Sequence, residues 1–242
     1  MKVSAAQFHP VSGNIVSNMA RHLEFIELAI TQDADLIFFS ELSLTGYEPH
    51  LAKSLAYDKS DPRLDIFQQR SDIHNIIIGV GLPILTNSQV QIAMSWFTPK
   101  ASRQTYAKQQ LHNDELPFFV QGDEQIVLRT PTHTLIPAIC YESLQESHAN
   151  NAANLGADIY LASVAKSASG MTKAILHYLT IAKKHSMHVL AANCIGPCDN
   201  FVSIGQSAVW NNQGELLVQM DSQSEGLVMI DTVSDRASIY PL

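Results

Sequence analysis

Short hydrophobic runs alternate with amphipathic stretches along the first part of the chain. Lys2 to Gln7 alternates with the two-residue period of a strand, and residues 15–30 place apolar side chains at helical spacing. Leu36 to Phe39 is a wholly apolar run, which is typical of a buried strand. Asp61-Pro62 is typical of a helix start, because proline fits the first turn of a helix.

The middle of the chain is rich in strand-like runs. These are Ile76 to Val80, Gln91 to Phe97, Arg103 to Ala107 and Thr132 to Ile139, the last of which leads directly to Cys140.

A helix is predicted after Cys140, ending near Leu155 with Gly156 as its stop. The elements predicted beyond it are a strand at Ile159 to Ala162, a helix at Met171 to His185, a strand at Val189 to Ala192, and two or three further strands with a hairpin turn at Asn212-Gln213-Gly214.

This alternation predicts a mixed α/β protein in which helices cover sheets, although periodicity alone does not fix the number of sheets. No linker, low-complexity tract or clear repeat interrupts the sequence. We therefore expect residues 1–242 to form a single domain.

Composition and charge narrow the classes of partner. The formal net charge of -8 disfavours a nucleic-acid backbone or an anionic membrane surface. No apolar stretch approaches the roughly 20 residues that span a bilayer, and the first residues contain no signal-peptide hydrophobic region. The expectation is a soluble, cytoplasmic protein without nucleic-acid or membrane partners.

The three cysteines, Cys140, Cys194 and Cys198, are too few for a disulfide framework, and we expect reduced thiols. Cys194 and Cys198 lie near His185 and His188 and could be considered metal ligands. Zinc sites more often show Cys-x-x-Cys or a second matched pair, so no metal site is predicted.

Three predicted strands end in residues capable of chemistry: Glu41, Lys108 and Cys140. One sheet edge can bring a base, a cation and a thiol together, and free N–H groups of a following helix would lower the pKa of the thiol. Each residue also has a purely structural interpretation, without a role in catalysis. Most free cysteines are small buried apolar groups, and glutamates or lysines after strands are commonly solvated.

The surrounding motifs resemble those of the carbon–nitrogen hydrolase (nitrilase) superfamily. Residues 38–47 resemble its first catalytic block, Tyr106 to Leu111 its Tyr-x-Lys-x-x-Leu block, and Ile139 to Glu142 its Cys-Tyr-acidic block. The resemblance continues through residues 191–193 and 205–207, so it covers nearly the whole chain.

The sequence departs from the family after Cys-Tyr-acidic. Many members continue with a basic residue, an aromatic residue and a proline, whereas this chain reads Ser143-Leu144-Gln145-Glu146. This departure puts the substrate in question rather than the chemistry, since Glu41, Lys108 and Cys140 are present.

The resemblance implies an α-β-β-α sandwich of four layers and a thiol mechanism without a metal or organic cofactor. Cys140 would attack an amide carbon, Glu41 would serve as acid and base, and Lys108 with a backbone N–H near Tyr141 would stabilise the oxyanion. Glu115 would orient Lys108 or hold the substrate nitrogen.

The expected substrate is a small linear amide, with an N-carbamoyl compound or a nitrile as alternatives. A non-catalytic binding protein on the same fold is a further alternative. Tyr47, Tyr141, Ser163 and Val164 are candidate pocket walls, and Lys166 is a conceivable partner for an anionic substrate. The resemblance also implies a homodimer or larger homo-oligomer.

Ser163 to Lys166 also matches the Ser-x-x-Lys pattern of serine acyl-transfer enzymes. The Ser-Asp-Asn and Lys-Thr-Gly signatures of those enzymes are absent, so the thiol mechanism is preferred.

Overall fold

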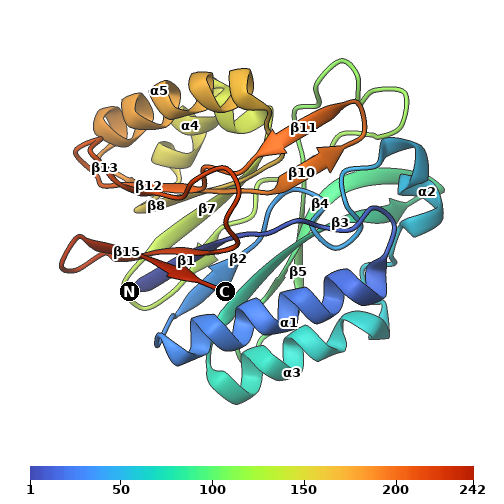
Figure 1. Cartoon of the computed structure of the whole chain (residues 1–242), viewed down its shortest axis with the longest axis horizontal. Helices are drawn as coiled ribbons and strands as arrows, with labels where there is room; N and C mark the ends of the chain where they lie inside the picture. Colours follow the sequence, from blue (N-terminus) through green and yellow to red (C-terminus); the bar gives the residue numbers. More distant parts are fainter.

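The computed structural model describes all 242 residues and stacks two β-sheets face to face between two layers of helices (Figure 1). The strands β1, β2 and β3 of the first sheet are parallel, and antiparallel strands flank them on both sides. In spatial order this sheet contains β15 (Arg236–Pro241), β14 (Gly226–Asp231), β1 (Lys2–Gln7), β2 (Leu36–Phe38), β3 (Ile77–Thr86), β4 (Gln89–Phe97) and β5 (Gln104–Ala107).

The second sheet has a parallel centre as well, formed by β7, β8 and β9. Its spatial order is β13 (Leu216–Gln219), β12 (Ala208–Trp210), β9 (His188–Asn193), β8 (Ile159–Val164), β7 (Thr134–Ile139) and β6 (Leu128–Arg129). A separate hairpin, β10 (Ile195–Cys198) and β11 (Phe201–Ile204), follows β9.

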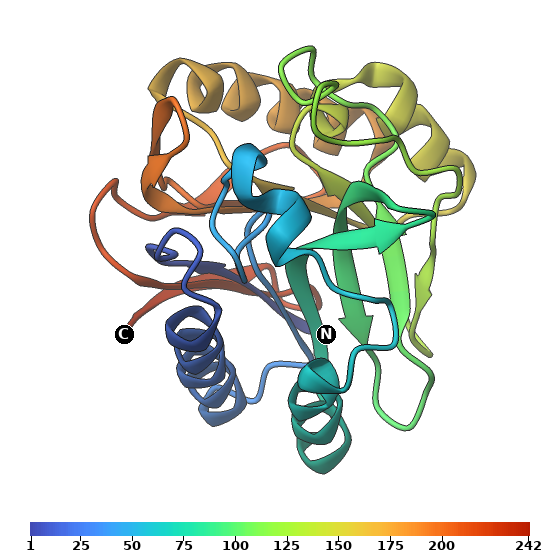
Figure 2. The same ribbon diagram turned by 90° about the vertical axis from the view of Figure 1, so that its right-hand side faces the viewer.

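Two helices cover the outer face of each sheet (Figure 2). The first sheet is covered by α1 (Ile15–Thr31) and α3 (Asp65–His74), and the second by α4 (Glu146–Asn154) and α5 (Ala168–His185). The remaining helical segments are short: η1 (Pro49–Leu51), α2 (Ala52–Leu55), η2 (Pro62–Leu64) and η3 (Glu142–Leu144). None of the helices is long and apolar enough to cross a membrane.

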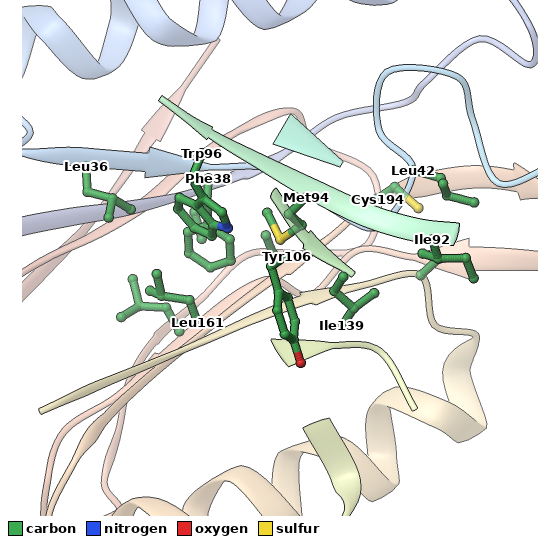
Figure 3. Close-up of a cluster of buried hydrophobic side chains, with 14 of the residues drawn as sticks. Leu36, Phe38, Leu42, Ile92, Met94, Trp96, Tyr106, Ile139, Leu161 and Cys194 are labelled. Carbon is green, nitrogen blue, oxygen red and sulfur yellow. The ribbon is translucent and has the colours of Figure 1, made fainter. Parts of the chain in front are cut away.

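Three hydrophobic clusters fill the spaces between the four layers. The largest lies between the sheets and includes Phe38, Met94 and Trp96 from the first sheet with Ile139 and Leu161 from the second (Figure 3). The other two lie between each sheet and its helices. Burial of both faces of each sheet explains why β2 and β8 contain short, wholly apolar runs.

The predicted elements are present, with two corrections. Six strands, rather than two or three, follow residue 193. The additional strands were not predicted because β10, β11 and β12 are too short to show a clear period. The helix expected directly after Cys140 is delayed: the 3₁₀ turn η3 comes first, and α4 begins at Glu146.

Candidate active site

The three chemical residues leave the ends of strands from both sheets. Glu41 follows β2, and Lys108 follows β5, which runs in the same direction because two antiparallel pairings separate it from β3. Both side chains therefore leave the same edge of the first sheet. Cys140 follows β7 of the second sheet, so the site is assembled from the two sheets together.

Lys108 is the centre of a buried charge cluster. Its Nζ donates to Glu41 Oε1 at 2.7 Å and to Glu115 Oε1 at 2.6 Å. All three side chains are almost fully buried. The second oxygen of Glu115 accepts the His112 N–H at 2.8 Å, and Tyr47 Oη donates to Oε1 at 3.0 Å. Glu115 is thereby fixed against Lys108.

Burial sets the proton affinities of this cluster. Burial raises the pKa of Glu41 to about 7, although the charge of Lys108 opposes the rise. Burial alone would lower the pKa of Lys108, but the facing Glu41, Cys140 and Glu115 raise it above its ordinary value. Lys108 therefore remains a cation while Glu41 can gain or lose a proton near neutral pH.

Cys140 occupies a sharp turn in the backbone. Its φ of 47° lies in the left-handed region, and its N–H donates to Ser163 O at 2.9 Å. Burial raises the pKa of the thiol to about 11, with Lys166 and Lys108 opposing the rise. The expectation that helix N–H groups lower this pKa is wrong for the resting site, because no α-helix begins here and desolvation dominates.

A hydrogen-bond acceptor and a hydrogen-bond donor, both without partners, lie beside the Cys140 thiol. Glu41 Oε2 is buried without a hydrogen-bond partner, and the Cys140 thiol is close enough to lower the pKa of the Glu41 carboxyl. The Tyr141 N–H donates to no acceptor within the chain. Proton acceptance by Glu41 and oxyanion binding by Lys108 with the Tyr141 N–H are therefore both chemically possible.

A pocket of about 380 Å³ opens above Cys140. Two of the four predicted wall residues, Tyr47 and Tyr141, line it, and the Phe201 ring packs edge-on against Tyr47 at a centroid distance of 5.6 Å. The other lining residues are His112, Asp114, Glu115, Leu144, Ala165, Lys166, Ser167, Gly170 and Lys173.

The structure does not bring Ser163 and Val164 into this lining. Both belong to β8 rather than to a loop, and both are fully buried. Ser163 Oγ donates to Phe39 O at 2.8 Å, so it ties the second sheet to the segment that carries Glu41. This hydroxyl is a structural link between the sheets, which removes the basis for a Ser163 nucleophile.

Glu142 is a buried residue beside the site, and the sequence pattern marked it only as part of a motif. Its Oε1 accepts from Ile139 N at 2.8 Å and from Tyr106 Oη at 2.6 Å. Its Oε2 accepts from Gln109 N at 2.7 Å. One buried carboxylate thus joins the backbone before Cys140 to the backbone after Lys108. Phe201, by contrast, escaped prediction because the β10–β11 hairpin was not predicted.

The segment that carries Glu41 packs directly on β3. A Cβ at Gly81 would lie 2.3 Å from Ser40 O and 2.7 Å from Leu42 N, which is closer than atoms can approach. Only glycine permits this contact between the strand and the turn around Glu41.

Cys194 and Cys198 are buried, with their sulfurs 3.6 Å apart. His188 Nε2 contacts Asp235 Oδ1 at 2.7 Å instead of these thiols. The structure contains no group of three or more His, Cys, Asp or Glu side chains placed to hold a metal ion.

Comparison with known proteins identifies the family of this chain. The family model described as carbon-nitrogen hydrolase matches residues 2–240. The chain belongs to the carbon-nitrogen hydrolase family. The resemblance seen in the three motif blocks is thereby confirmed.

Two curated relatives of this carbon-nitrogen hydrolase are glutamine-dependent NAD(+) synthetases. The protein from Acinetobacter baylyi is 27% identical over 240 residues, covering 93% of this chain and 43% of the relative. The protein from Thermotoga maritima is 25% identical over 247 residues, covering 98% of this chain and 42% of the relative. The chain therefore spans less than half the length of these relatives.

Solved structures confirm the nitrilase-type fold of this carbon-nitrogen hydrolase. The amidase from Nesterenkonia sp. AN1 superposes with a TM-score of 0.87 at 21% identity, covering 98% of this chain and 96% of that chain. A CN-hydrolase superfamily protein from Xanthomonas campestris gives 0.86 at 19% identity, covering 95% and 89%. The predicted four-layer α-β-β-α sandwich is therefore confirmed.

Proposed function

We propose that this chain hydrolyses the C–N bond of a small amide through a thioester on Cys140. The observation that carries the proposal is the contact of Lys108 Nζ with both Glu41 and Glu115, behind the pocket that Glu115 and Cys140 line. A fixed cation, a carboxylate with a pKa of about 7 and a thiol are the groups that acyl transfer to sulfur requires.

In the first half-reaction, Cys140 Sγ forms a bond to the amide carbon while its proton passes to Glu41 Oε2. Negative charge develops on the amide oxygen, where Lys108 Nζ and the Tyr141 N–H stabilise it. Because the pKa of Glu41 lies near 7 and that of Cys140 near 11, the proton stays on sulfur at rest and moves as attack occurs.

The intermediate then collapses. The C–N bond breaks, and protonated Glu41 returns the proton to the leaving nitrogen, which departs as ammonia or an amine. In the second half-reaction, Glu41 removes a proton from water and the water oxygen bonds to the acyl carbon. The C–S bond then breaks, and protonated Glu41 returns the proton to Cys140 Sγ, which restores the thiol and releases the carboxylic acid product. One carboxylate serves as base and acid in each half-reaction, and Glu115 keeps Lys108 in place throughout.

Relatives support an amide rather than another C–N compound. The Nesterenkonia amidase has been solved with butyramide, and variants of it carry the acetamide moiety of fluoroacetamide on the active-site cysteine. The curated relatives are named for their dependence on glutamine, which is itself an amide. N-carbamoyl compounds and nitriles remain the alternative substrates of this proposal, and a non-catalytic binding protein is its alternative from another class.

The experiment is ammonia release by purified protein from a panel of small amides, ω-amides, N-carbamoyl compounds and nitriles. We expect release by the parent and none above background by Cys140→Ala, with Cys198→Ala as the matched control that loses a thiol outside the pocket. Equal release by the parent and Cys140→Ala would refute the role of this thiol. An inert protein whose Cys140 also fails to react with an electrophile would favour the non-catalytic alternative.

A further inference from the structure

The charges that line the pocket are not balanced. Glu115 is paired with Lys108, and Asp114 Oδ1 lies 2.5 Å from His112 Nδ1. Two lysines of the lining, Lys166 and Lys173, have no carboxylate partner in the chain. Asp114 is the one other carboxylate of the lining, so the two lysines outnumber it and the accessible part of the pocket carries an excess of positive charge.

Lys166 is held in a fixed position despite this missing partner. Its N–H donates to Asn193 Oδ1 at 2.9 Å, and its carbonyl accepts from Asn193 Nδ2 at 3.2 Å and from Ser203 Oγ at 3.1 Å. The residue is only 6% exposed. A buried cation without a counter-charge is costly, and proteins retain such groups mainly where they serve a function.

The ammonium group of Lys166 is directed at the reaction centre. Its Nζ lies 3.6 Å from Cys140 Sγ and 3.5 Å from Cys140 O, and it makes no other hydrogen bond. An anion that binds Lys166 is therefore placed beside the nucleophile.

The N-terminal end of α5 adds positive electrostatic potential to the same side of the pocket. Ser167 caps this helix, and Ser167, Gly170 and Lys173 line the pocket together with Lys166. The N-terminus of a helix carries partial positive charge, which favours an anion nearby. Lys173 is exposed on the first turns of α5, where it can meet the outer end of a bound molecule.

We propose that the pocket selects amides that also carry a carboxylate, with Lys166 binding that carboxylate and Lys173 reinforcing the attraction. This inference names the substrate class of the proposed amidase and rests on that function. The short distance from Nζ to Sγ favours a substrate in which few bonds separate the carboxylate from the scissile amide.

A competing role for Lys166 is to stabilise the Cys140 thiolate itself. The two roles differ in one respect: a thiolate counter-ion accelerates attack on every electrophile, whereas an anion subsite accelerates attack only on anionic ones. Iodoacetate and iodoacetamide are nearly the same size and differ in charge, so the ratio of their alkylation rates separates the roles.

The first experiment measures alkylation of Cys140 by both reagents at low ionic strength in the parent, Lys166→Met, Lys166→Arg and Lys173→Met. We expect the parent to show a higher iodoacetate-to-iodoacetamide ratio than a free small thiol. Lys166→Met should lower this ratio by about tenfold and Lys173→Met by about threefold, because a charge-assisted contact and a longer-range attraction are lost. Lys166→Arg should retain most of the preference, and the exposed Lys183→Met should leave the ratio unchanged.

Alkylation requires no turnover, so this result is independent of whether an amide substrate is found. A parent ratio equal to that of a free thiol would overturn the anion subsite. The anion subsite would also be overturned if Lys166→Met slowed alkylation by both reagents equally and shifted the pH dependence of alkylation to higher pH. That result would show that Lys166 stabilises the Cys140 thiolate.

The second experiment compares hydrolysis of succinic acid monoamide with that of butyramide. The anion subsite predicts a higher kcat/KM for the monoamide in the parent and loss of this advantage in Lys166→Met. A neutral amide hydrolysed as well as the anionic one would contradict the subsite while sustaining the amidase. Iodoacetate preference without hydrolysis of any amide would sustain the subsite and remove the proposed function.

Discussion

At the scale of single residues, the environment of Glu41 determines when its carboxyl group can accept a proton. One oxygen is held by Lys108, and the other is buried without a partner beside the Cys140 thiol. Burial raises the pKa of Glu41 from 4.5 to about 7, so its ionised fraction changes steeply around neutral pH.

This environment predicts the acidic limb of the pH–rate profile. The proposed mechanism needs ionised Glu41, so kcat/KM should rise with pH, reach half its maximum near pH 7 and level off above it. The measurement is kcat/KM on the best amide of the panel from about pH 5 to pH 9, with circular dichroism at each pH as the control for folding. A limb near pH 4.5, the value of an unburied glutamate, would show that burial does not govern this group.

Sequence motifs were sufficient to predict that Glu41, Lys108 and Cys140 lie together, because each follows a strand within a recognisable block. They were insufficient for Ser163 and Val164. Whether a residue beside a strand end faces the pocket or the core depends on strand length, and β8 continues through Val164. The accessible wall begins one residue later, at Ala165.

At the scale of elements, the site depends on the connection between the segments after β5 and β7. Glu142 makes that connection by accepting the N–H groups of Ile139 and Gln109. It does not line the pocket, so it acts by holding the elements that carry Cys140 and Lys108.

Replacing Glu142 by Gln should therefore impair both stability and turnover. A glutamine presents one N–H₂ group to donors that now face a carboxylate, which leaves buried N–H groups unpaired at a cost of about 1–3 kcal/mol. We expect a reduced free energy of unfolding in urea and a lower kcat with a smaller effect on KM. The matched control is Glu146→Gln on α4, whose side chain is 68% exposed. Equal, small effects in the two variants would contradict the positioning role of Glu142.

The sequence predicted the long helices better than the short strands of the C-terminal part of the chain. The long α1 and α5 show a clear helical period, and most of the buried parallel strands contain recognisable apolar runs, whereas β10 and β11 have four residues each and show neither. The turn η3 was missed for another reason. Its backbone is determined by the contacts of Glu142 with distant segments, and these contacts leave no local pattern.

At the scale of the whole molecule, the number of sheets was not predictable from periodicity. Both sheets contain buried parallel strands that are mainly apolar, and only the spatial order separates β1–β3 from β7–β9. The two-sheet arrangement was predicted from the resemblance of the motifs to those of the carbon–nitrogen hydrolase superfamily. The single domain over residues 1–242 and the homo-oligomer stay predictions.

We propose that the protein forms a homodimer through the outer face of α5. Leu176 and Leu179 are 65% and 40% exposed one turn apart on this face, and the family resemblance implies a homodimer or larger homo-oligomer. Light scattering at micromolar concentration should give twice the mass of the chain, and Leu176→Lys should shift the mass toward the monomer. Val16→Lys, at an exposed position on α1, is the control and should leave the mass unchanged. A monomeric parent would contradict the prediction.

The origin of the site in two sheets has an evolutionary consequence. The layer between the sheets, with Met94 and Ile139 among its side chains, fixes the distance between the base on one sheet and the nucleophile on the other. A change of side-chain volume in this layer alters heat resistance and catalytic rate at once. Selection for either property therefore acts on both, whereas the two outer layers can drift to suit a new temperature with less effect on the chemistry.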